Sequence, residues 1–222
     1  MIKKMIFIKT VIITIFSSVA FGQIYVGGGL TGLYGVGSPK SFYGLNFLIE
    51  FPQGEETAFY GKLTYQFSQK SDEFQYDYLE PKNPINYAKG FEFKSSMDYL
   101  MLEVGDKWFF RGSYDEGLDG YFAYNGLICM NTIKKDYLSS IYNISDYIIL
   151  PLRGSVFTIG VGAGLGIKYT VQSIDYTFFS EIGVNFLLVE LFSPNETAVD
   201  GLEVFKKDMN TTFSIGVRKF FR

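Results

Sequence analysis

Four glycines recur at every second position from Gly160 to Gly166, and closely spaced glycines can form a loop that binds phosphate. Glycine-rich loops cradle phosphate groups, but they need the spacing G-x-G-x-x-G at a turn from strand to helix. Here the spacing is two throughout, and the alternation of glycine or polar residues with apolar ones continues to Val171. A small-residue transmembrane helix is a second alternative, but the apolar run is shorter than the roughly 18 residues of a span. Strict alternation therefore predicts a β-strand with one bare face.

Charged residues on alternating segments form a second group that could do chemistry. They are few and of mixed sign, and we expect five of them on one interior face near the short turns: Glu50, Lys62, Lys168, Glu181 and Arg218. Charges removed from water must pair or change their protonation. We therefore predict an ion-pair network, with Arg218 and Lys168 near Glu181 and with Lys62 near Glu50. The alternative is that some of these side chains are hydrated residues of a rim.

The chain has no histidine and one cysteine, Cys129, and this composition excludes several catalytic classes. A Ser-His or Asp-His apparatus and a histidine metal site are both absent. A lone cysteine forms no internal disulfide and no thiolate metal cluster. Carboxylate-only or Ser-Lys chemistry stays open, but no compact group of residues suggests it. We expect no enzyme activity, no cofactor and no metal, and the net charge of −3 argues against nucleic acid as a partner.

Residues 1–22 have the pattern of a secretory signal peptide. Three lysines flank the start of an apolar core at 11–16, and Ala20 and Gly22 occupy the −3 and −1 positions of a cleavage site before Gln23. The apolar core is too short for a comfortable membrane span, and a retained signal anchor is the alternative. We expect a mature protein of residues 23–222.

Period-two patterning dominates the mature sequence and predicts eight strands. Short connectors follow the second, fourth and sixth strands, and long connectors follow the third, fifth and seventh at 70–94, 134–153 and 193–208. Aromatic residues make up 18% of the chain, which fits strands that face an apolar solvent. The expected strands are 24–37, 42–51, 57–69, 95–110, 118–133, 154–171, 175–192 and 209–221.

Long connectors at one end and tight turns at the other are typical of an up-and-down outer-membrane barrel. A soluble lipocalin-like barrel also alternates, but its polar outer face would carry far more charge than these strands do. We predict an all-β fold, a closed antiparallel transmembrane β-barrel of eight strands with both termini periplasmic. Aromatic residues near the strand ends would form interfacial girdles: Phe51, Phe59, Tyr169, Tyr176 and Phe221.

Bulky side chains should fill the lumen of so small a barrel. The glycines between 160 and 166, together with Gly27 and Gly29, would leave the room that these side chains need. The expected fillers are Tyr60, Tyr121, Phe179 and Phe220. An open pore for solutes is therefore disfavoured.

The end of the chain resembles the C-terminal assembly signal of outer-membrane barrels. Ser214, Gly216 and Phe221 match that signal, whereas Lys219 stands where an apolar residue is usual and Arg222 follows the final aromatic residue. With the strand "FTIGVGAGLGIKY", the mature chain is similar to the small porin-like eight-stranded outer-membrane β-barrel family of Gram-negative bacteria. The resemblance implies insertion into outer-membrane lipid by the barrel-assembly machinery. It implies little about function, because such barrels serve as anchors, adhesins, lipid enzymes and machine subunits.

The connector 70–94 is the candidate binding surface. Its aromatic residues alternate with polar ones on both sides of "EPKNP", which predicts two strands that extend beyond the membrane. Exposed aromatic residues would bind protein or glycan, and a self-packed hairpin is the alternative. The segment "DYIILPLRG" in the connector 134–153 also needs a cover, either the barrel mouth or a partner subunit. The candidate residues are Phe74, Tyr76, Tyr78, Tyr87, Phe91 and Phe93.

Two functions follow from these expectations. The first is a structural and binding barrel with a filled lumen, which acts through its extracellular loops. The second is an accessory subunit of an outer-membrane machine, such as a type IX secretion or barrel-assembly complex, with a protein partner at its loops or lipid face. A small porin is a third alternative.

Overall fold

The computed structural model describes residues 24–35, 41–70, 74–83, 87–111, 117–138, 146–148, 153–192 and 209–221. The expected signal peptide and the connector 193–208 lie outside these residues, as do Gln23 and Arg222. No helix in the described part of the chain is long and apolar enough to cross a bilayer.

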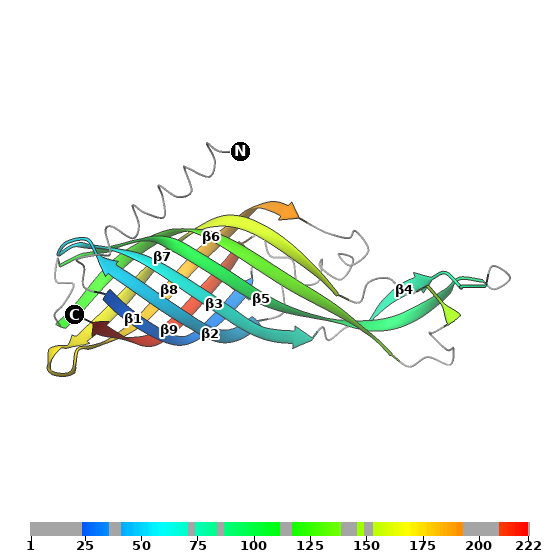
Figure 1. Ribbon diagram of the computed structural model, residues 1–222, viewed down its shortest axis with the longest axis horizontal. Coiled ribbons are helices and arrows are strands. Elements are labelled where there is room, and N and C mark those ends of the chain that lie inside the picture. The colour runs from blue at the N-terminus through cyan, green and yellow to red at the C-terminus, as the bar shows by residue number, and fades with distance from the viewer. Residues whose placement is uncertain are drawn as a thin grey trace.

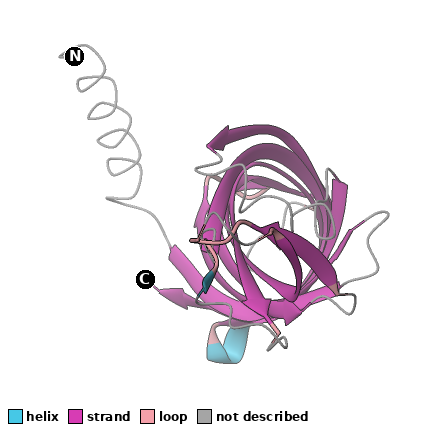
Figure 2. Cartoon of the chain, turned by 90° about the vertical axis from the view of Figure 1, so that its right-hand side faces the viewer, coloured by secondary structure: helices cyan, strands magenta, loops and turns pink. Residues whose placement is uncertain are grey.

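The described residues form one antiparallel sheet, and eight of its nine strands close into a barrel. Strand β3 pairs with β5, and β1 pairs with β9, so the ladder returns to its start with Ile24 opposite Phe221. Figure 2 shows the closed ring of strands. The strands are β1 (Ile24–Gly35), β2 (Ser41–Pro52), β3 (Thr57–Lys70), β4 (Gln75–Leu79), β5 (Lys89–Phe109), β6 (Gly117–Tyr137), β7 (Arg153–Val171), β8 (Tyr176–Phe192) and β9 (Met209–Phe221).

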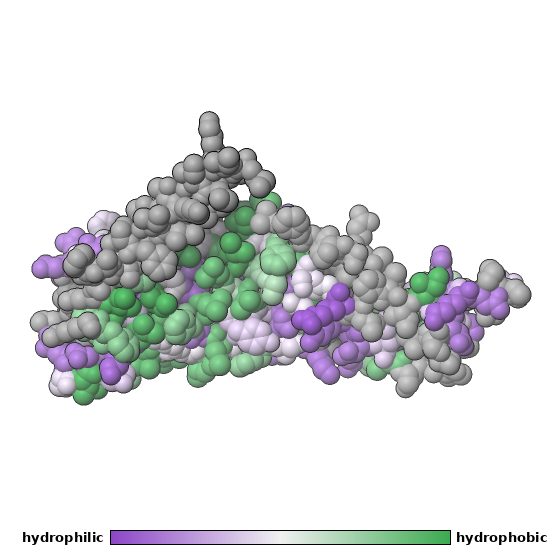
Figure 3. Space-filling model, viewed as in Figure 1, coloured by the Kyte–Doolittle hydropathy of each residue, from purple (hydrophilic) through white to green (hydrophobic). Residues whose placement is uncertain are grey.

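Alternation along each strand decides which side chains face the lumen. In β7 the residues at even positions, Gly160 to Lys168, are buried or half-buried, whereas Ile159, Val161 and Leu165 are exposed. The apolar face therefore points outward, which is the reverse of a lipocalin-like barrel. Figure 3 shows apolar residues gathered over the barrel wall. Such a wall is stable only in lipid, where a closed barrel leaves no backbone group of the ladder unpaired.

The two ends of the barrel differ. At one end, the turn end, short turns at 53–56 and 172–175 join consecutive strands, and β1 begins where β9 finishes. At the other end β5 and β6 continue beyond their neighbours, because each has 21 residues against 12 in β1 and in β2. Strand β4 pairs with the projecting part of β5, from Gln75 opposite Phe93 to Leu79 opposite Lys89. We call residues 74–83, which include β4, residues 87–94, which lead into β5, and residues 136–137 of β6 the arm (Figure 1).

The prediction of an eight-stranded closed barrel is confirmed. Strand β5 begins at Lys89 instead of 95, and β6 ends at Tyr137 instead of 133, because their alternation continues into segments assigned to connectors. The connector 70–94 forms the hairpin of β4 and β5 that its aromatic alternation predicted.

Candidate functional site

A chain of ion pairs crosses the lumen toward the turn end. The Nζ of Lys62 lies 2.8 Å from Glu103 and 2.9 Å from Glu181, and the Nζ of Lys107 lies 3.3 Å from Glu181 and 2.5 Å from Glu50. Glu50 also pairs with Arg218. All six side chains are at most 7% exposed. Three carboxylates thus compensate three cations, which is the condition for burying them.

The five charged residues expected in the lumen are all buried there, but their partners differ from the prediction. Arg218 pairs with Glu50 instead of Glu181, and Lys62 pairs with Glu181 and Glu103 instead of Glu50. Because these five side chains are at most 7% exposed, they are not hydrated residues of a rim.

The predicted network also differs from the observed one at Lys168, Glu103 and Lys107. The Nζ of Lys168 lies 5.2 Å from the centre of the Phe109 ring, a cation–π contact away from Glu181. Glu103 and Lys107 belong to the network but were not predicted for it. The signal was present, because both alternate with apolar residues along β5.

Tyrosines enclose the ion pairs. The hydroxyl of Tyr121 donates to Glu181 at 3.0 Å, and the Nδ2 of Asn125 donates to the Tyr60 hydroxyl at 2.9 Å. The Nζ of Lys107 lies over both tyrosine rings, 4.6 Å from the Tyr121 centroid and 4.9 Å from that of Tyr60. Cation–π contacts and hydrogen bonds therefore replace the water that these groups lose.

Glycines on the inner face provide the space for these rings. A Cβ at Gly166 would overlap the ring of Tyr121, and a Cβ at Gly216 would lie 2.7 Å from the Cζ of Phe179. Phe220 is partly buried and stacks on Tyr25, with ring centroids 4.8 Å apart. The glycine run of β7 is therefore part of the packing of the lumen and not a phosphate loop.

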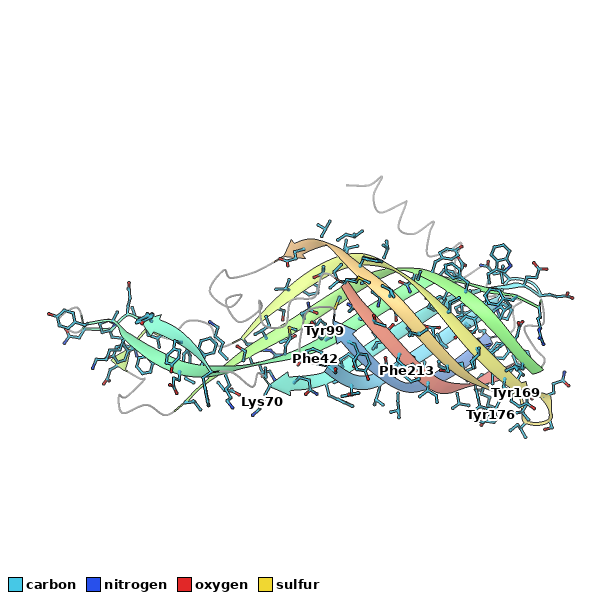
Figure 4. The ribbon with its side chains drawn as sticks, turned by 180° about the vertical axis from the view of Figure 1, so that it is seen from behind. Phe42, Lys70, Tyr99, Tyr169, Tyr176 and Phe213 are labelled. Carbon is cyan, nitrogen blue, oxygen red and sulfur yellow. The ribbon has the colours of Figure 1, made fainter. Side chains whose placement is uncertain are left out.

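A second layer fills the lumen nearer to the arm. Its rings, Phe42 and Tyr99, meet edge to face with centroids 4.7 Å apart (Figure 4). The layer consists of buried apolar residues, and its two rings lie eight residues from Glu50 along β2 and four residues from Glu103 along β5. Its members are Leu33, Phe42, Met97, Tyr99, Met101, Leu127, Cys129, Ile133 and Val156.

The arm has a small core of its own. Leu79, Phe91 and Tyr147 are buried together, and the rings of Phe91 and Tyr147 are 4.9 Å apart. Residues 146–148 lie beside 80–82, because Lys82 N donates to the carbonyl of Asp146 at 2.9 Å and Ile148 N donates to Glu80 at 2.7 Å. Part of the apolar segment "DYIILPLRG" is thus covered by the arm.

The predicted binding surface divides between the two faces of the arm. Phe91 and Phe93 are buried, so their inclusion in a surface was wrong. Phe74, Tyr76, Tyr78 and Tyr87 are exposed, Tyr78 by 80% and Tyr87 by 86%. The Tyr76 hydroxyl donates to Glu92 at 2.5 Å, and the Nζ of Lys94 lies 4.4 Å from the Phe74 ring centroid. An aromatic face therefore remains on the arm, narrower than predicted.

The arrangement of strands is similar to that of solved structures. A major outer membrane protein from Thermus thermophilus aligns with a TM-score of 0.52 at 11% identity, over 89% of this chain and 99% of that chain. The chain has the fold of a small outer-membrane β-barrel. With its apolar wall, the protein is an integral outer-membrane β-barrel.

Two further outer-membrane proteins are similar at lower scores. Ail of Yersinia pestis aligns with a TM-score of 0.49 at 12% identity, over 90% of this chain and 99% of Ail. OprG of Pseudomonas aeruginosa aligns with a TM-score of 0.49 at 9% identity, over 90% of this chain and 96% of OprG. No protein-family model and no curated protein sequence matches the chain.

The outer-membrane barrel carries aromatic residues on its outer face at the turn end. Tyr169 and Phe221 are exposed there, and Phe51, Phe59 and Tyr176 are half-buried (Figure 4). The Nζ of Lys219 lies 5.6 Å from the rings of both Tyr176 and Phe221. This lysine therefore lies among girdle aromatics, where a cation can reach the membrane surface.

The residues of the expected assembly signal lie on both faces of β9. Ser214 is buried and its hydroxyl donates to that of Thr31 at 3.2 Å, whereas Phe221 faces outward. Gly216 lies beside Phe179. Insertion by the assembly machinery stays a prediction.

Proposed function

We propose that this outer-membrane barrel is a closed structural and binding protein, which conducts no solute and presents its arm outside the cell. The observation that carries the binding role is the exposure of Tyr78 and Tyr87 on an arm with its own core. Aromatic rings held in water by a folded support are typical of protein-binding and glycan-binding surfaces.

The difference between the barrel ends supports the orientation. Small outer-membrane barrels have short periplasmic turns and longer extracellular connections. The turn end, where β1 begins and β9 finishes, is then periplasmic, and the arm is extracellular.

The two layers in the lumen support a closed barrel. The ion pairs join strands on opposite sides of the lumen, from Lys62 on β3 to Glu181 on β8. The layer around Phe42 and Tyr99 closes the side nearer to the arm. Ion flow would have to separate the buried pairs and displace the apolar layer as well.

Binding can be tested with the purified protein in mild detergent on arrays of extracellular glycans and peptides. We expect retention of at least one class of ligand, and a loss of at least tenfold in affinity when Phe74, Tyr76, Tyr78 and Tyr87 are all changed to Ala. The matched control changes four exposed residues of the lipid-facing wall to Ala: Tyr43, Tyr65, Phe47 and Phe67. Equal binding by the arm variant, or no retention by the wild type, would contradict the binding role.

Conductance in planar bilayers tests the closed lumen. We expect no steady openings, whereas regular openings on the nanosiemens scale would identify a small porin. Solubilisation of native membranes in mild detergent tests the accessory-subunit alternative. If a partner co-purifies in equal amount and the arm variant retains it, the protein is an accessory subunit of a machine and not a lone binding protein.

A further inference from the structure

Three cations lie in one row across the outer face of the barrel, just below the arm. Lys70 on β3 is opposite Ser96 on β5, Ser96 is opposite Lys134 on β6, and Lys134 is opposite Arg153 on β7. We call these four residues the cationic rung. Figure 4 labels Lys70 at the end of β3, where the barrel meets the arm.

The rung faces outward. Met97 and Ile133, the neighbours of Ser96 and Lys134, are buried in the lumen, so alternation directs the rung residues to the outer side. Lys70, Lys134 and Arg153 are exposed, whereas Ser96, with its small side chain, is only 6% exposed between them. The barrel wall thus carries cations that water or lipid can reach.

The three cations have no carboxylate partner among the described residues. Asp98 and Asp136 lie on either side of the rung, each two residues along its strand, and neither forms an ion pair with it. Lys134 and Arg153 are directly opposite each other, an arrangement that costs stability when nothing anionic lies between them.

The rung lies above the apolar wall, and one polar row, Asp98, Thr132 and Ser155, lies between them. Four residues nearer to the turn end on β5, β6 and β7, the matching row contains Leu100, Met130 and Phe157. Four residues span roughly 13 Å along a strand, and the tilt of the strands shortens this height further. The cations are therefore at the level where the headgroups of the surrounding leaflet begin.

Among the described residues, the outward cations at this level lie on one side of the barrel. Strands β1, β2 and β8 contain no Lys or Arg, and the matching outward residues near the arm end of β1, β2 and β9 are Tyr34, Ser41 and Thr211. In the part of the chain that the structure describes, the cations of the rung therefore form one local site.

We propose that the cationic rung binds a lipid of the same leaflet whose headgroup carries two phosphates and whose acyl chains lie on the apolar wall below. Three strand spacings separate Lys70 from Arg153, about 14 Å, which is more than one phosphate can bridge. One phosphate fits between Lys134 and Arg153, where the guanidinium can bind it through two hydrogen bonds. A second phosphate reaches Lys70 across Ser96. This inference needs the transmembrane barrel but not the proposed binding role of the arm.

Native mass spectrometry of the full-length protein in detergent tests the proposal, with titration of acylated glucosamine disaccharides that carry two, one or no phosphates. We expect the affinity to fall with each phosphate removed. The variant K70Q/K134Q/R153Q should bind the bisphosphorylated lipid at least tenfold more weakly. The matched control K82Q/R111Q/K219Q removes the same charges from exposed positions elsewhere and should bind normally.

A charge-preserving variant, K70R/K134R/R153K, separates loss of charge from loss of fold, and heat-modifiable migration on gels confirms that each barrel is folded. Equal binding by the rung variant, or equal binding of the phosphate-free lipid, would overturn the proposal. Displacement of the lipid by millimolar inorganic phosphate alone would overturn the assignment to lipid, because the site would then hold a free anion.

Discussion

The ring of Tyr121 on β6 occupies the space that a side chain at Gly166 on β7 would need. The two residues are direct partners in the ladder, and the hydroxyl of the same tyrosine donates a hydrogen bond to Glu181. The tyrosine is thus held on both sides, and the glycine beside it is required by packing and not by backbone freedom.

Substitution of Gly166 by Ala should lower the free energy of unfolding by about 1–3 kcal/mol, as overpacking of a filled interior does. Tyr121 cannot move away without losing its hydrogen bond to Glu181. Urea unfolding in detergent, followed by the fluorescence of Trp108, measures the change. The control is Gly61→Ala, because no atom lies within 4 Å of a Cβ at that position. Equal stability of both variants would show that Tyr121 adapts freely.

Substitution of Glu181 by Gln should destabilise the barrel by about 3 kcal/mol, because two buried ammonium groups lose the charge between them. The amide of Gln keeps an acceptor for Tyr121, so the loss reports the ion pairs. Glu55→Gln, at an exposed turn position, is the control and should leave the unfolding curve unchanged. A neutral effect of Glu181→Gln would mean that water enters the lumen and solvates Lys62 and Lys107.

Substitution of Tyr147 by Ala should open the arm without weakening the barrel. Tyr147 is 6% exposed against Leu79 and Phe91, and loss of a buried ring costs about 3 kcal/mol. Limited proteolysis should cut the arm faster, while the urea midpoint of the barrel stays the same. Tyr87→Ala, at a ring that is 86% exposed, is the matched control. A cleavage rate unchanged by Tyr147→Ala would argue against a separate core in the arm.

The hydrogen bond from Tyr76 to Glu92 raises the pKa of the Tyr76 phenol above 10.0. Because the folded pKa exceeds the unfolded one, this contact stabilises the arm below pH 10 and its contribution is lost as the pH rises through the folded pKa. A ¹³C NMR titration of labelled tyrosine should show the Tyr76 pKa falling in Glu92→Gln and unchanged in Glu80→Gln. An identical Tyr76 titration in wild type and Glu92→Gln would show that the bond does not persist in solution.

The barrel could be predicted from the sequence because alternation of period two is a local property of each strand. The alternation from Gly160 to Lys168 identifies the inward face of the strand from the sequence alone. The apolar residues of the opposite face indicate that this face contacts lipid and not water. In β6 the same alternation continues past the expected end at 133 into residues 134–137. These residues were assigned to the long connector 134–153, so the extension was missed.

The ion-pair partners could not be predicted, because alternation gives the face of a residue and not its height in the barrel. Height depends on the stagger between strands, which places Lys62 opposite Glu103 on β5. The long side chain of Lys62 then reaches across the lumen to Glu181. Phe91 was misplaced for a related reason, since its cover, Tyr147, is distant in the sequence.

The continuity of β5 and β6 has a mechanical consequence. The two strands are paired without interruption from Phe93 opposite Tyr137 in the arm to Phe109 opposite Tyr121 at the turn end. A force applied at the tip of the arm would load this ladder in shear, so that many hydrogen bonds share the tension at once. The pull would pass into the wall of the barrel along the backbone, and the whole height of the barrel would act as the anchor of the tether.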